Sequence, residues 1–322
     1  MKAWLVKQWC GPEGLEWAET PTPEPKEGQV LIRVAAAALN FLDTLMIQGR
    51  YQVKPPLPFT PGVEISGTVE RAGAGTDFRP GERVCALLDW GGFAECALAQ
   101  AGDLIRLPDG VDLVGGAVMP VVYPTAYRAL KQRAQLRAGE WVLVHAGAGG
   151  VGLAAIQLAK AWGAKVIATA GSAKKVAVCR EQGADWALDY SDACWVEEVK
   201  TLTEGRGVNV IVDPVGGDVT DLSMKCLAWE GRIVIVGFAS GRIPQIPANR
   251  LLLKCAAAMG VSTGDTRAKQ QEITRGIFQD LFAMLQKGQI RPLVSRRYPM
   301  TEAPQALKDL ASRETVGKVV LV

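Results

Sequence analysis

The sequence lacks several features that would point to particular functions. Its 322 residues include a single histidine, His145, which excludes a metal site built from several histidines. The seven cysteines are odd in number and form no Cys-x-x-Cys pair, so neither a disulfide framework nor a zinc ribbon is expected. Free buried thiols in a reducing compartment fit this pattern, and we expect a cytoplasmic protein.

Charge of one sign and long apolar runs are also scarce. There are 36 basic and 33 acidic residues, a net charge of +3, with no block of like charges, so we expect no nucleic-acid partner. The longest apolar stretches, such as Val34–Leu39, fall well short of the roughly 20 residues that a membrane helix needs. No membrane partner is therefore expected. The N-terminal segment lacks the apolar core and cleavage site of a signal peptide, so no signal peptide is expected.

The order of turns and apolar runs divides the chain in two. At roughly 150 residues per domain the length suggests two domains, and the pattern changes near residue 122. Before that point, short runs separated by turns are typical of a small barrel or sandwich. The strands expected there are Gln29–Leu39, Glu64–Ala72, Glu82–Leu88 and Phe93–Gln100.

Beyond residue 122, strands alternate with helices, which indicates a parallel sheet covered on both faces and therefore an α/β domain. The expected strands are Trp141–His145, Lys165–Ala170, Val208–Asp213, Arg232–Phe238 and Ala256–Val261, and the expected helices are Val151–Trp162, Lys174–Gln182 and Gln270–Lys287. The chain ends in GKVVLV, a strand with no helix after it.

The most specific motif is a glycine loop. Gly147, Gly149 and Gly152 fit G-x-G-x-x-G, and they lie between a predicted strand and a predicted helix, which is the context that a dinucleotide site requires. Glycine lets the backbone approach a pyrophosphate, and the helix N-terminus offers N–H groups and partial positive charge to the phosphates. The alternative is a tight turn that binds nothing.

The end of the second strand selects the cofactor. NAD sites usually place an acid there to bind the ribose 2′-hydroxyl, but residues 168–175 contain no acid and include Ser172, Lys174 and Lys175. A 2′-phosphate needs cationic donors without a nearby carboxylate, so the sequence favours NADPH. In the alternative interpretation, Ser172 only caps the next helix and both lysines are solvated.

Taken together, these segments resemble the medium-chain dehydrogenase/reductase superfamily, and within it the zinc-free NADPH:quinone oxidoreductases that include zeta-crystallin. The resemblance is carried by NFLDTLMIQGRY at 40–51, LPFTPGVEISGTVERAG at 57–73, FRPGERV at 78–84, HAGAGGVG at 145–152 and SRETVGKVVLV at 312–322. It implies an α/β fold with a Rossmann doubly wound parallel sheet domain and a GroES-like, mainly-β catalytic domain. The implied divisions are a catalytic domain at 1–122, an NADP(H)-binding domain at 123–261, and a segment at 262–322 that returns to the catalytic domain.

The resemblance also implies roles for individual residues. Asn40, Asp43 and Tyr51 fall where similar quinone oxidoreductases line the substrate cleft beside the nicotinamide, so these are the expected catalytic residues. The cofactor-binding residues that it implies are Gly147, Gly149, Gly150, Val151, Gly152, Gly171, Ser172, Lys175, Tyr190, Phe238, Ser240 and Arg313. The alternatives are that Asn40 and Asp43 cap a helix and that Tyr51 is a packing aromatic. We expect His145 to be a packing residue at a strand end.

Zinc chemistry is not expected. Zinc-dependent relatives carry a Cys near the position of Asn40–Asp43 and a His before the Glu of the P-G-x-E turn, where this chain has Val63. The four-cysteine lobe is missing as well, because 97–120 contains no cysteine. Catalytic zinc normally needs three protein ligands around an open position.

We therefore expect an NADPH-dependent, zinc-independent reductase of a quinone or another conjugated acceptor, an enone or enal. An enoyl thioester reductase is a related alternative, and a non-catalytic NADPH-binding protein, structural or RNA-associating, is one of another class. The resemblance also implies a homodimer, because superfamily members commonly pair through the last strand of the cofactor sheet. Here that strand is Ala256–Val261, an apolar run that would otherwise be an exposed edge.

Overall fold

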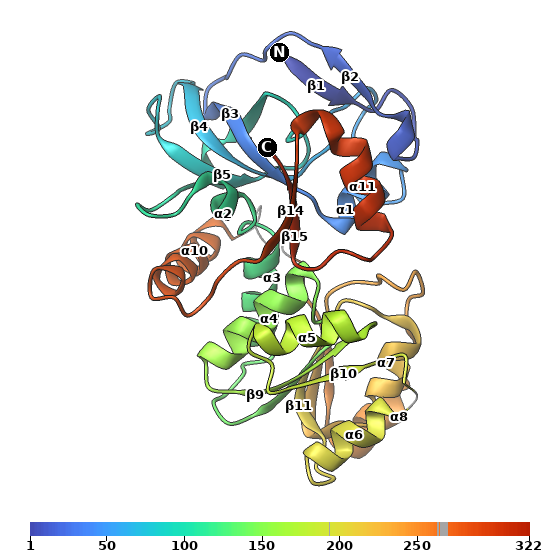
Figure 1. Ribbon diagram of the computed structural model, residues 1–322. Coiled ribbons are helices and arrows are strands. Elements are labelled where there is room, and N and C mark those ends of the chain that lie inside the picture. The colour runs from blue at the N-terminus through green and yellow to red at the C-terminus, as the bar shows by residue number, and fades with distance from the viewer. Residues whose placement is uncertain (193, 263, 265–269) are drawn as a thin grey trace. The chain divides into compact units, whose positions relative to one another are not determined.

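The computed structural model describes residues 1–192, 194–262, 264 and 270–322, which form two compact units (Figure 1). Unit 1 comprises Met1–Val121, Gln270–Phe278 and Pro292–Val322, and unit 2 comprises Val122–Lys269 and Gln279–Arg291. Within the described residues, no helix has the length and apolarity that crossing a membrane requires.

Unit 1 is mainly antiparallel β-structure. Its main sheet has the order β14-β15-β3-β4-β5-β7, with β6 also paired to β3, and β1 and β2 form a separate hairpin. The strands are β1 (Lys2–Leu5), β2 (Glu16–Glu19), β3 (Gln29–Ala38), β4 (Glu64–Ala72), β5 (Arg83–Leu87), β6 (Cys96–Gln100), β7 (Leu104–Arg106), β14 (Val294–Tyr298) and β15 (Lys318–Leu321). The helices within it are α1 (Phe41–Ile47), α2 (Leu113–Ala117) and α11 (Ala303–Ala311).

The core of unit 1 forms where apolar side chains of these strands meet. Ile32 of β3 and Ile65 of β4 are both fully buried, as is Phe93 just before β6. The strands β3 and β4 approach closely at Gly67, where a Cβ atom would lie 2.0 Å from the carbonyl oxygen of Arg33. Only glycine fits that position without moving the neighbouring backbone.

The C-terminal segment divides between the two units. Its last strand, β15, pairs antiparallel with β3, with Val320 opposite Ala38. The sequence predicted that all of 262–322 returns to the first domain, whereas Gln279–Arg291, which includes the end of α10 (Gln271–Gln286), belongs to unit 2. Two hydrogen bonds connect this stretch to the rest of unit 2, between the Gln157 amide and the Arg291 backbone, each 2.9 Å long.

Unit 2 is a parallel α/β domain whose sheet has the order β10-β9-β8-β11-β12-β13. Counted from β8, this is the 3-2-1-4-5-6 order of a doubly wound Rossmann sheet, which confirms the predicted fold class. The strands are β8 (Trp141–Val144), β9 (Lys165–Ala170), β10 (Trp186–Asp189), β11 (Val208–Asp213), β12 (Leu227–Ile235) and β13 (Ala257–Gly260). The helices are α3 (Val122–Tyr127), α4 (Gly150–Ala161), α5 (Ala173–Glu181), α6 (Trp195–Leu202), α7 (Gly217–Ser223) and α8 (Ala248–Lys254), with a π-helical turn at Arg128–Arg133.

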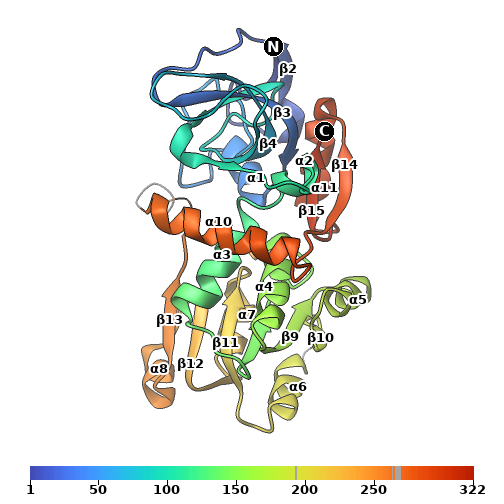
Figure 2. The same ribbon diagram turned by 90° about the vertical axis from the view of Figure 1, so that its left-hand side faces the viewer.

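The strand order determines where a ligand can bind in unit 2. Figure 2 shows β13 and α8 at one edge of the sheet and β10 with α5 at the other. At the centre, Val142, Leu143 and Val144 of β8 are fully buried, as expected of a strand covered on both faces. The order reverses between β8 and β11, and the carboxyl ends of the strands at such a point form the usual binding crevice.

Strand β12 differs from its predicted range of Arg232–Phe238. It starts at Leu227 and ends at Ile235, because the pairing with β11 shifts register between Val208 and Val210 and so includes the earlier residues. Glu230, at φ +55°, lies in this irregular stretch. After Val236, which donates to the Asp213 carbonyl, the chain leaves the sheet as a loop.

All seven cysteines are free thiols. Four are buried, namely Cys85, Cys96, Cys179 and Cys226. The prediction of buried thiols is wrong for Cys194 and Cys255, which are exposed because Cys194 precedes the first residue of α6 and Cys255 ends α8 in the left-handed conformation.

Candidate functional site

The glycine loop connects β8 to α4 at the centre of the unit 2 sheet. Gly149 is the N-cap of α4, has extended backbone and offers no side-chain cap. The amides of Gly150, Val151 and Gly152 in the first turn therefore receive no side-chain acceptor from the N-cap. A helix start of this kind is suited to a phosphate group.

Two of these positions require glycine for steric reasons. A Cβ atom on Gly147 would lie 2.9 Å from both Ala168 Cβ and Cys179 Sγ. A Cβ atom on Gly152 would lie 2.3 Å from the carbonyl oxygen of Ala146, so α4 could not pack against the loop. The loop therefore has the close strand–turn–helix packing of a dinucleotide-binding turn.

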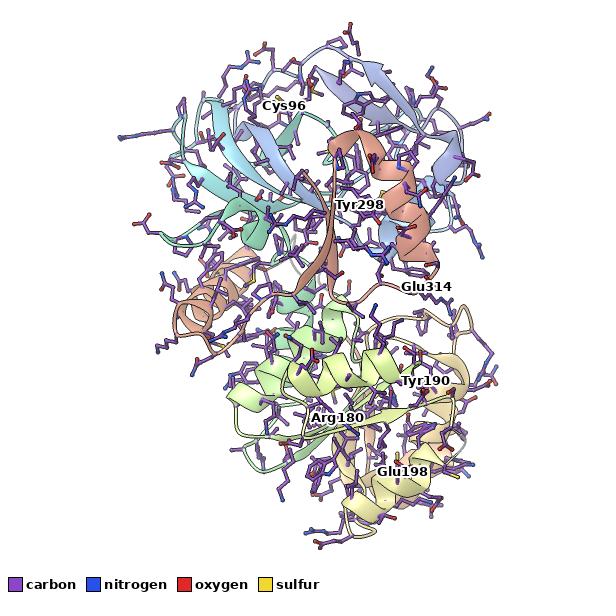
Figure 3. All side chains as sticks on the ribbon, viewed as in Figure 1. Cys96, Arg180, Tyr190, Glu198, Tyr298 and Glu314 are labelled. Atoms are coloured by element: carbon purple, nitrogen blue, oxygen red, sulfur yellow. The ribbon has the colours of Figure 1, made fainter. Side chains whose placement is uncertain are left out.

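The end of β9 forms the next part of the site. A Cβ atom on Gly171 would lie 2.9 Å from the hydroxyl oxygen of Tyr190 (labelled in Figure 3), so the phenol packs over this turn. Ser172 is the N-cap of α5, and its hydroxyl accepts from the Lys175 backbone N–H at 3.4 Å. Ser172 therefore caps the helix, as the alternative interpretation predicted. The cap uses only the backbone of Lys175, and the side chains of Lys175 and of the exposed Lys174 take no part in it.

The nearest acid in register with this strand end is Asp189, which lies opposite Ala170. Its Oδ1 accepts from the Ser191 N–H at 2.9 Å and from the Ser191 hydroxyl at 2.7 Å, and these bonds hold the pKa of Asp189 below its ordinary value. The acid is therefore engaged in its own turn. Sequence reasoning missed it because β10 was not predicted.

The loop after β12 lies beside the loop after β11. Ala239 N–H donates to the Pro214 carbonyl and Ser240 N–H donates to the Val215 carbonyl. Phe238 is 39% exposed, and a Cβ atom on Gly216 would lie 3.1 Å from its ring. The predicted residues Phe238 and Ser240 thus lie at the carboxyl edge of the sheet, as the glycine loop does.

His145 is fully buried at the end of β8. Its Nδ1 lies 2.8 Å from Thr169 Oγ1, its Nε2 lies 2.7 Å from Ser223 Oγ, and its ring meets Trp195 edge-on. Burial lowers the pKa of His145 to about 4, against a smaller opposing effect of the Asp213 carboxylate. These contacts are those of a packed, neutral ring.

In unit 1, four buried polar side chains lie together at the start of α1. We call Asn40, Asp43, Glu64 and Lys318 the acid–lysine cluster. Lys318 Nζ donates to the Leu39 carbonyl at 2.8 Å, to Asn40 Oδ1 at 2.7 Å and to Glu64 Oε2 at 2.8 Å. Sequence reasoning missed the Lys318–Glu64 pair, although a lone lysine at the head of an apolar strand is a signal that a buried acid must accompany it.

The amide of Asn40 is fully used within this cluster. Its Nδ2 donates to Glu64 Oε2 at 3.0 Å and to the Ala38 carbonyl at 3.3 Å, while its Oδ1 accepts from Lys318. Its backbone N–H donates to Asp43 Oδ2 at 2.7 Å, which is part of a helix-capping arrangement at the start of α1. Asn40 and Asp43 therefore cap the start of α1, as the alternative interpretation predicted.

Asp43 is the electrostatically unusual member of the cluster. It is fully buried, and its Oδ1 has no hydrogen-bond partner in the described part of the chain. Burial raises the pKa of Asp43 to about 7, although the Asn40 N–H and the charge of Lys318 act in the opposite direction. Its carboxyl group is thus poised to carry a proton near neutral pH.

The other predicted residues of unit 1 are Tyr51 and Arg313. Tyr51 is half-buried and packs against the core of unit 1. Arg313 is exposed, follows α11 and has φ +61°. The structure brings Asn40 and Asp43 together, whereas the glycine loop and its neighbours form a second group, within unit 2.

A metal centre would need several ligands in one place. Among the residues that the structure describes, no three His, Cys, Asp or Glu side chains form a group that could hold a metal ion. Near the position where zinc-dependent relatives carry a cysteine ligand the chain has Asn40, and at the position of their histidine ligand it has Val63.

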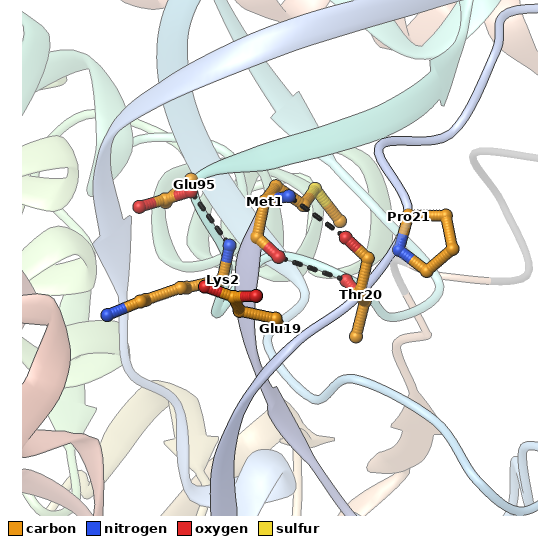
Figure 4. A pocket seen from close by; sticks show the side chains of 6 residues that line it. All are labelled: Met1, Lys2, Glu19, Thr20, Pro21 and Glu95. Atoms are coloured by element: carbon orange, nitrogen blue, oxygen red, sulfur yellow. Dashed lines mark hydrogen bonds between the residues drawn. The ribbon is translucent and has the colours of Figure 1, made fainter.

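Unit 1 also contains a hollow of about 630 Å³ beside the β1–β2 hairpin (Figure 4). Its lining comprises Met1, Lys2, Glu19, Thr20, Pro21 and Glu95. The N-terminal amine donates to the Thr20 carbonyl at 2.9 Å, and the Lys2 N–H donates to Glu95 Oε2 at 2.7 Å. None of the predicted site residues lines it.

Comparison with known proteins relates both units to one group of enzymes. Residues 26–109 match the family described as "Alcohol dehydrogenase GroES-like domain", and residues 150–279 match "Zinc-binding dehydrogenase". Quinone oxidoreductase-like protein 2 of Rattus norvegicus is 40% identical over 295 residues, which cover 91% of this chain and 84% of that protein. Quinone oxidoreductase of the same species is 36% identical over 326 residues, which cover 100% and 98% of the two chains.

A solved structure matches this chain over its full length. It is the quinone oxidoreductase of Escherichia coli complexed with NADPH, which is 30% identical to this chain with a TM-score of 0.94, and the match covers 100% of both chains.

Proposed function

Since the chain belongs to the quinone oxidoreductase family of the medium-chain dehydrogenase/reductase superfamily, we propose that it is an NADPH-dependent reductase of quinones or other conjugated acceptors. The observation that carries this proposal is the glycine loop at the start of α4, together with the acid-free, lysine-bearing end of β9. It is supported by the Escherichia coli relative, whose solved structure is a complex with NADPH.

The residues of unit 2 fit this cofactor. Glycine at 147 and 152 allows the close packing of the loop against β9 and α4, and Gly149, whose Cβ would lie 3.3 Å from the Ala146 carbonyl oxygen, is the position where the backbone would approach a pyrophosphate. The turn at Gly171–Ser172 under Tyr190, with Lys175 beside it, would hold the adenosine 2′-phosphate. Asp189 stays ionised, and its Oδ1 is bound by Ser191 and so is not available to accept from a ribose hydroxyl, as the acid of an NAD site would.

When bound, NADPH supplies the hydride. In this proposal the protein holds the acceptor, excludes water and donates a hydrogen bond to the oxygen where negative charge develops. Tyr51 is the proposed donor, because a phenol keeps its proton at neutral pH and its ring can stack on a flat acceptor. Asn40 would act indirectly, because both of its amide hydrogens are bound by Glu64 and Ala38.

We further propose that the reaction needs no zinc. The chain has no cysteine near Asn40 and has Val63 in the P-G-V-E turn. A conjugated acceptor delocalises the charge that it gains, so it can react without a metal to polarise it. Saturated alcohols, whose oxidation needs a stabilised alkoxide, should be poor substrates.

One assay tests these points together. NADPH oxidation would be followed with a panel of quinones, enones and enals, and NADP⁺ reduction with primary and secondary alcohols, before and after dialysis against a strong chelator. We expect turnover of conjugated acceptors that dialysis does not change. Efficient alcohol oxidation, or one stoichiometric zinc with activity lost on chelation, would contradict the proposal.

We also propose a homodimer that forms through the outer edge of unit 2. β13 is the last strand of its sheet, and the neighbouring α8 exposes Leu252 and Leu253 at 77% and 72%. An edge strand beside exposed leucines favours pairing with a second copy. Sedimentation at micromolar concentration should give twice the 34.4 kDa chain mass, and Leu252→Glu with Leu253→Glu should give the single-chain mass. A wild type that remains at 34.4 kDa contradicts this proposal.

A further inference from the structure

The glycine loop begins with a residue in an unfavourable conformation. Ala146 has φ +48°, in the left-handed region that residues with a Cβ atom rarely adopt. It lies directly between His145 and Gly147, so it sets the direction in which the chain enters the loop. Such backbone strain persists only where the surrounding contacts hold it in place.

The contacts on both sides of Ala146 do this. The His145 backbone N–H donates to the Val212 carbonyl at 3.1 Å, and the Gly147 N–H donates to the Thr169 carbonyl at 2.8 Å. The Ala146 carbonyl in turn accepts from the Gly149 N–H at 2.9 Å. The side chain of His145 adds a fourth connection, since its ring lies between Thr169 and Ser223.

The hydrogen-bond directions in this connection are determined by Ser223. Its hydroxyl has one proton, and that proton is directed at the Val219 carbonyl, 2.6 Å away. The Ser223 oxygen must therefore accept from His145 Nε2–H, which leaves His145 Nδ1 as the acceptor for the Thr169 hydroxyl. The ring is neutral at physiological pH because burial lowers the pKa of His145 to about 4.

We propose that His145 is a positioning residue for the cofactor. Its ring ties the strained residue before the phosphate loop to Thr169, which lies two residues before Gly171 at the end of β9. One side chain thereby sets the spacing between the amides at the start of α4 and the turn that would hold the adenosine 2′-phosphate. This inference rests on the proposed binding of NADPH.

Substitutions can separate the two halves of the connection. Thr169→Val keeps the shape of the residue and removes only its hydroxyl. His145→Asn places an acceptor near the position of Nδ1 and keeps the bond to Thr169, whereas His145→Gln places a donor near the position of Nε2 and keeps the bond to Ser223. The proposal requires that the variants lacking the Thr169 bond are the ones that bind cofactor weakly.

The measurement is the Kd for NADPH by fluorescence titration, together with KM and kcat. For Thr169→Val and His145→Gln we expect Kd and KM to rise about tenfold, the effect of one lost hydrogen bond, with kcat at saturating NADPH unchanged. His145→Asn should stay within about threefold of the wild type on the same scale. Hydrogen exchange of the Gly147–Gly152 amides should be faster in unliganded Thr169→Val.

A matched control is Ile211→Val, a buried change in β11, outside the loop, that should lower the melting temperature. If Thr169→Val lowers only the melting temperature, as Ile211→Val does, and leaves Kd unchanged, the positioning role is wrong. A wild type that does not bind NADPH at all would instead overturn the proposed function, so the two failures are distinguishable.

Discussion

Each unit buries a group of polar side chains, and the two groups solve the same problem differently. In unit 2, the neutral ring of His145 has a partner at each nitrogen, Thr169 and Ser223. In unit 1, the acid–lysine cluster contains a lysine and two acids, and one carboxylate oxygen of Asp43 has no hydrogen-bond partner among the described residues. A complete neutral network mainly fixes geometry, whereas a charged network makes stability depend on which groups carry protons.

The largest expected effect comes from breaking the charged network. Lys318→Met removes the cation that lies 2.8 Å from Glu64 Oε2 and leaves a fully buried carboxylate beside Asp43. We expect the free energy of unfolding to fall by about 3–5 kcal/mol, measured by urea denaturation.

The double variant Lys318→Met with Glu64→Gln removes both charges and provides the control. It should lose less stability than Lys318→Met alone, because no uncompensated charge remains in the core. Equal losses in the two variants would show that packing, and not charge, determines the cost.

The second effect concerns pH, and here the units act in opposite directions. Folded Asp43 keeps its proton up to about pH 7, whereas the unfolded chain loses it near pH 3.8, so stability falls as pH rises through this window. Folded His145 takes up a proton only below about pH 4, whereas the unfolded chain does so near 6.5, so stability falls as pH decreases through that window. Between pH 4 and 6.5 the two contributions oppose each other.

Asp43→Asn removes one side of this balance. Relative to the wild type, its free energy of unfolding should increase from pH 4 to pH 7 by an amount on the order of 4 kcal/mol. Urea denaturation of both proteins at four pH values gives this difference. The contributions of all other titratable groups cancel, because the two proteins share them. A difference that stays constant with pH would show that Asp43 has an ordinary pKa in the folded state.

A smaller effect is expected at the end of β9. Lys175→Ala should weaken NADPH binding by about 10–150-fold, the cost of one charge-assisted contact of roughly 1.5–3 kcal/mol, and leave NADH binding nearly unchanged. The N-cap of α5 survives this change, because Ser172 accepts from the backbone N–H of residue 175. Fluorescence titration with both cofactors measures the effect.

Lys165→Ala, at the opposite end of the same strand, is the matched control and should leave both affinities unchanged. If the wild type binds NADPH and NADH equally, the cofactor preference inferred from the acid-free strand end is wrong.

Local patterns predicted much of the fold. The bounds of β4, β9 and β11 match the predicted ones, because each is an apolar or alternating run between clear turn signals. The glycine loop was recognisable because glycine is required there by close backbone packing.

Contacts between distant residues could not be predicted in the same way. Lys318 and Glu64 are 254 residues apart, and only the pairing of β15, β3 and β4 brings them together. The His145–Ser223 bond likewise depends on how α7 packs in unit 2. The short strand β10 and the helices α6 to α8 were missed because their apolar pattern covers only a few residues.

The smallest expected effect concerns the proposed donor in unit 1. Tyr51→Phe keeps the ring and removes the hydroxyl. Removing a donor from a fully charged oxyanion costs about 10²–10³ in kcat, but a conjugated acceptor spreads its charge, so we expect a loss nearer tenfold. Tyr51→Ala, which also removes the stacking surface, should raise KM for the acceptor more than Tyr51→Phe does.

The matched control for this prediction is Tyr298→Phe, the same change on β14 of the same unit, where the hydroxyl bonds to Asp309 (Figure 3 labels Tyr298). It should leave kcat unchanged, because Tyr298 is not one of the predicted site residues. Full activity of Tyr51→Ala on every acceptor would assign the hydrogen-bond donor to another residue. A loss with Tyr51→Phe that Tyr298→Phe does not share would identify the Tyr51 hydroxyl as the group that meets the developing charge, because folding defects common to both variants are then removed from the comparison.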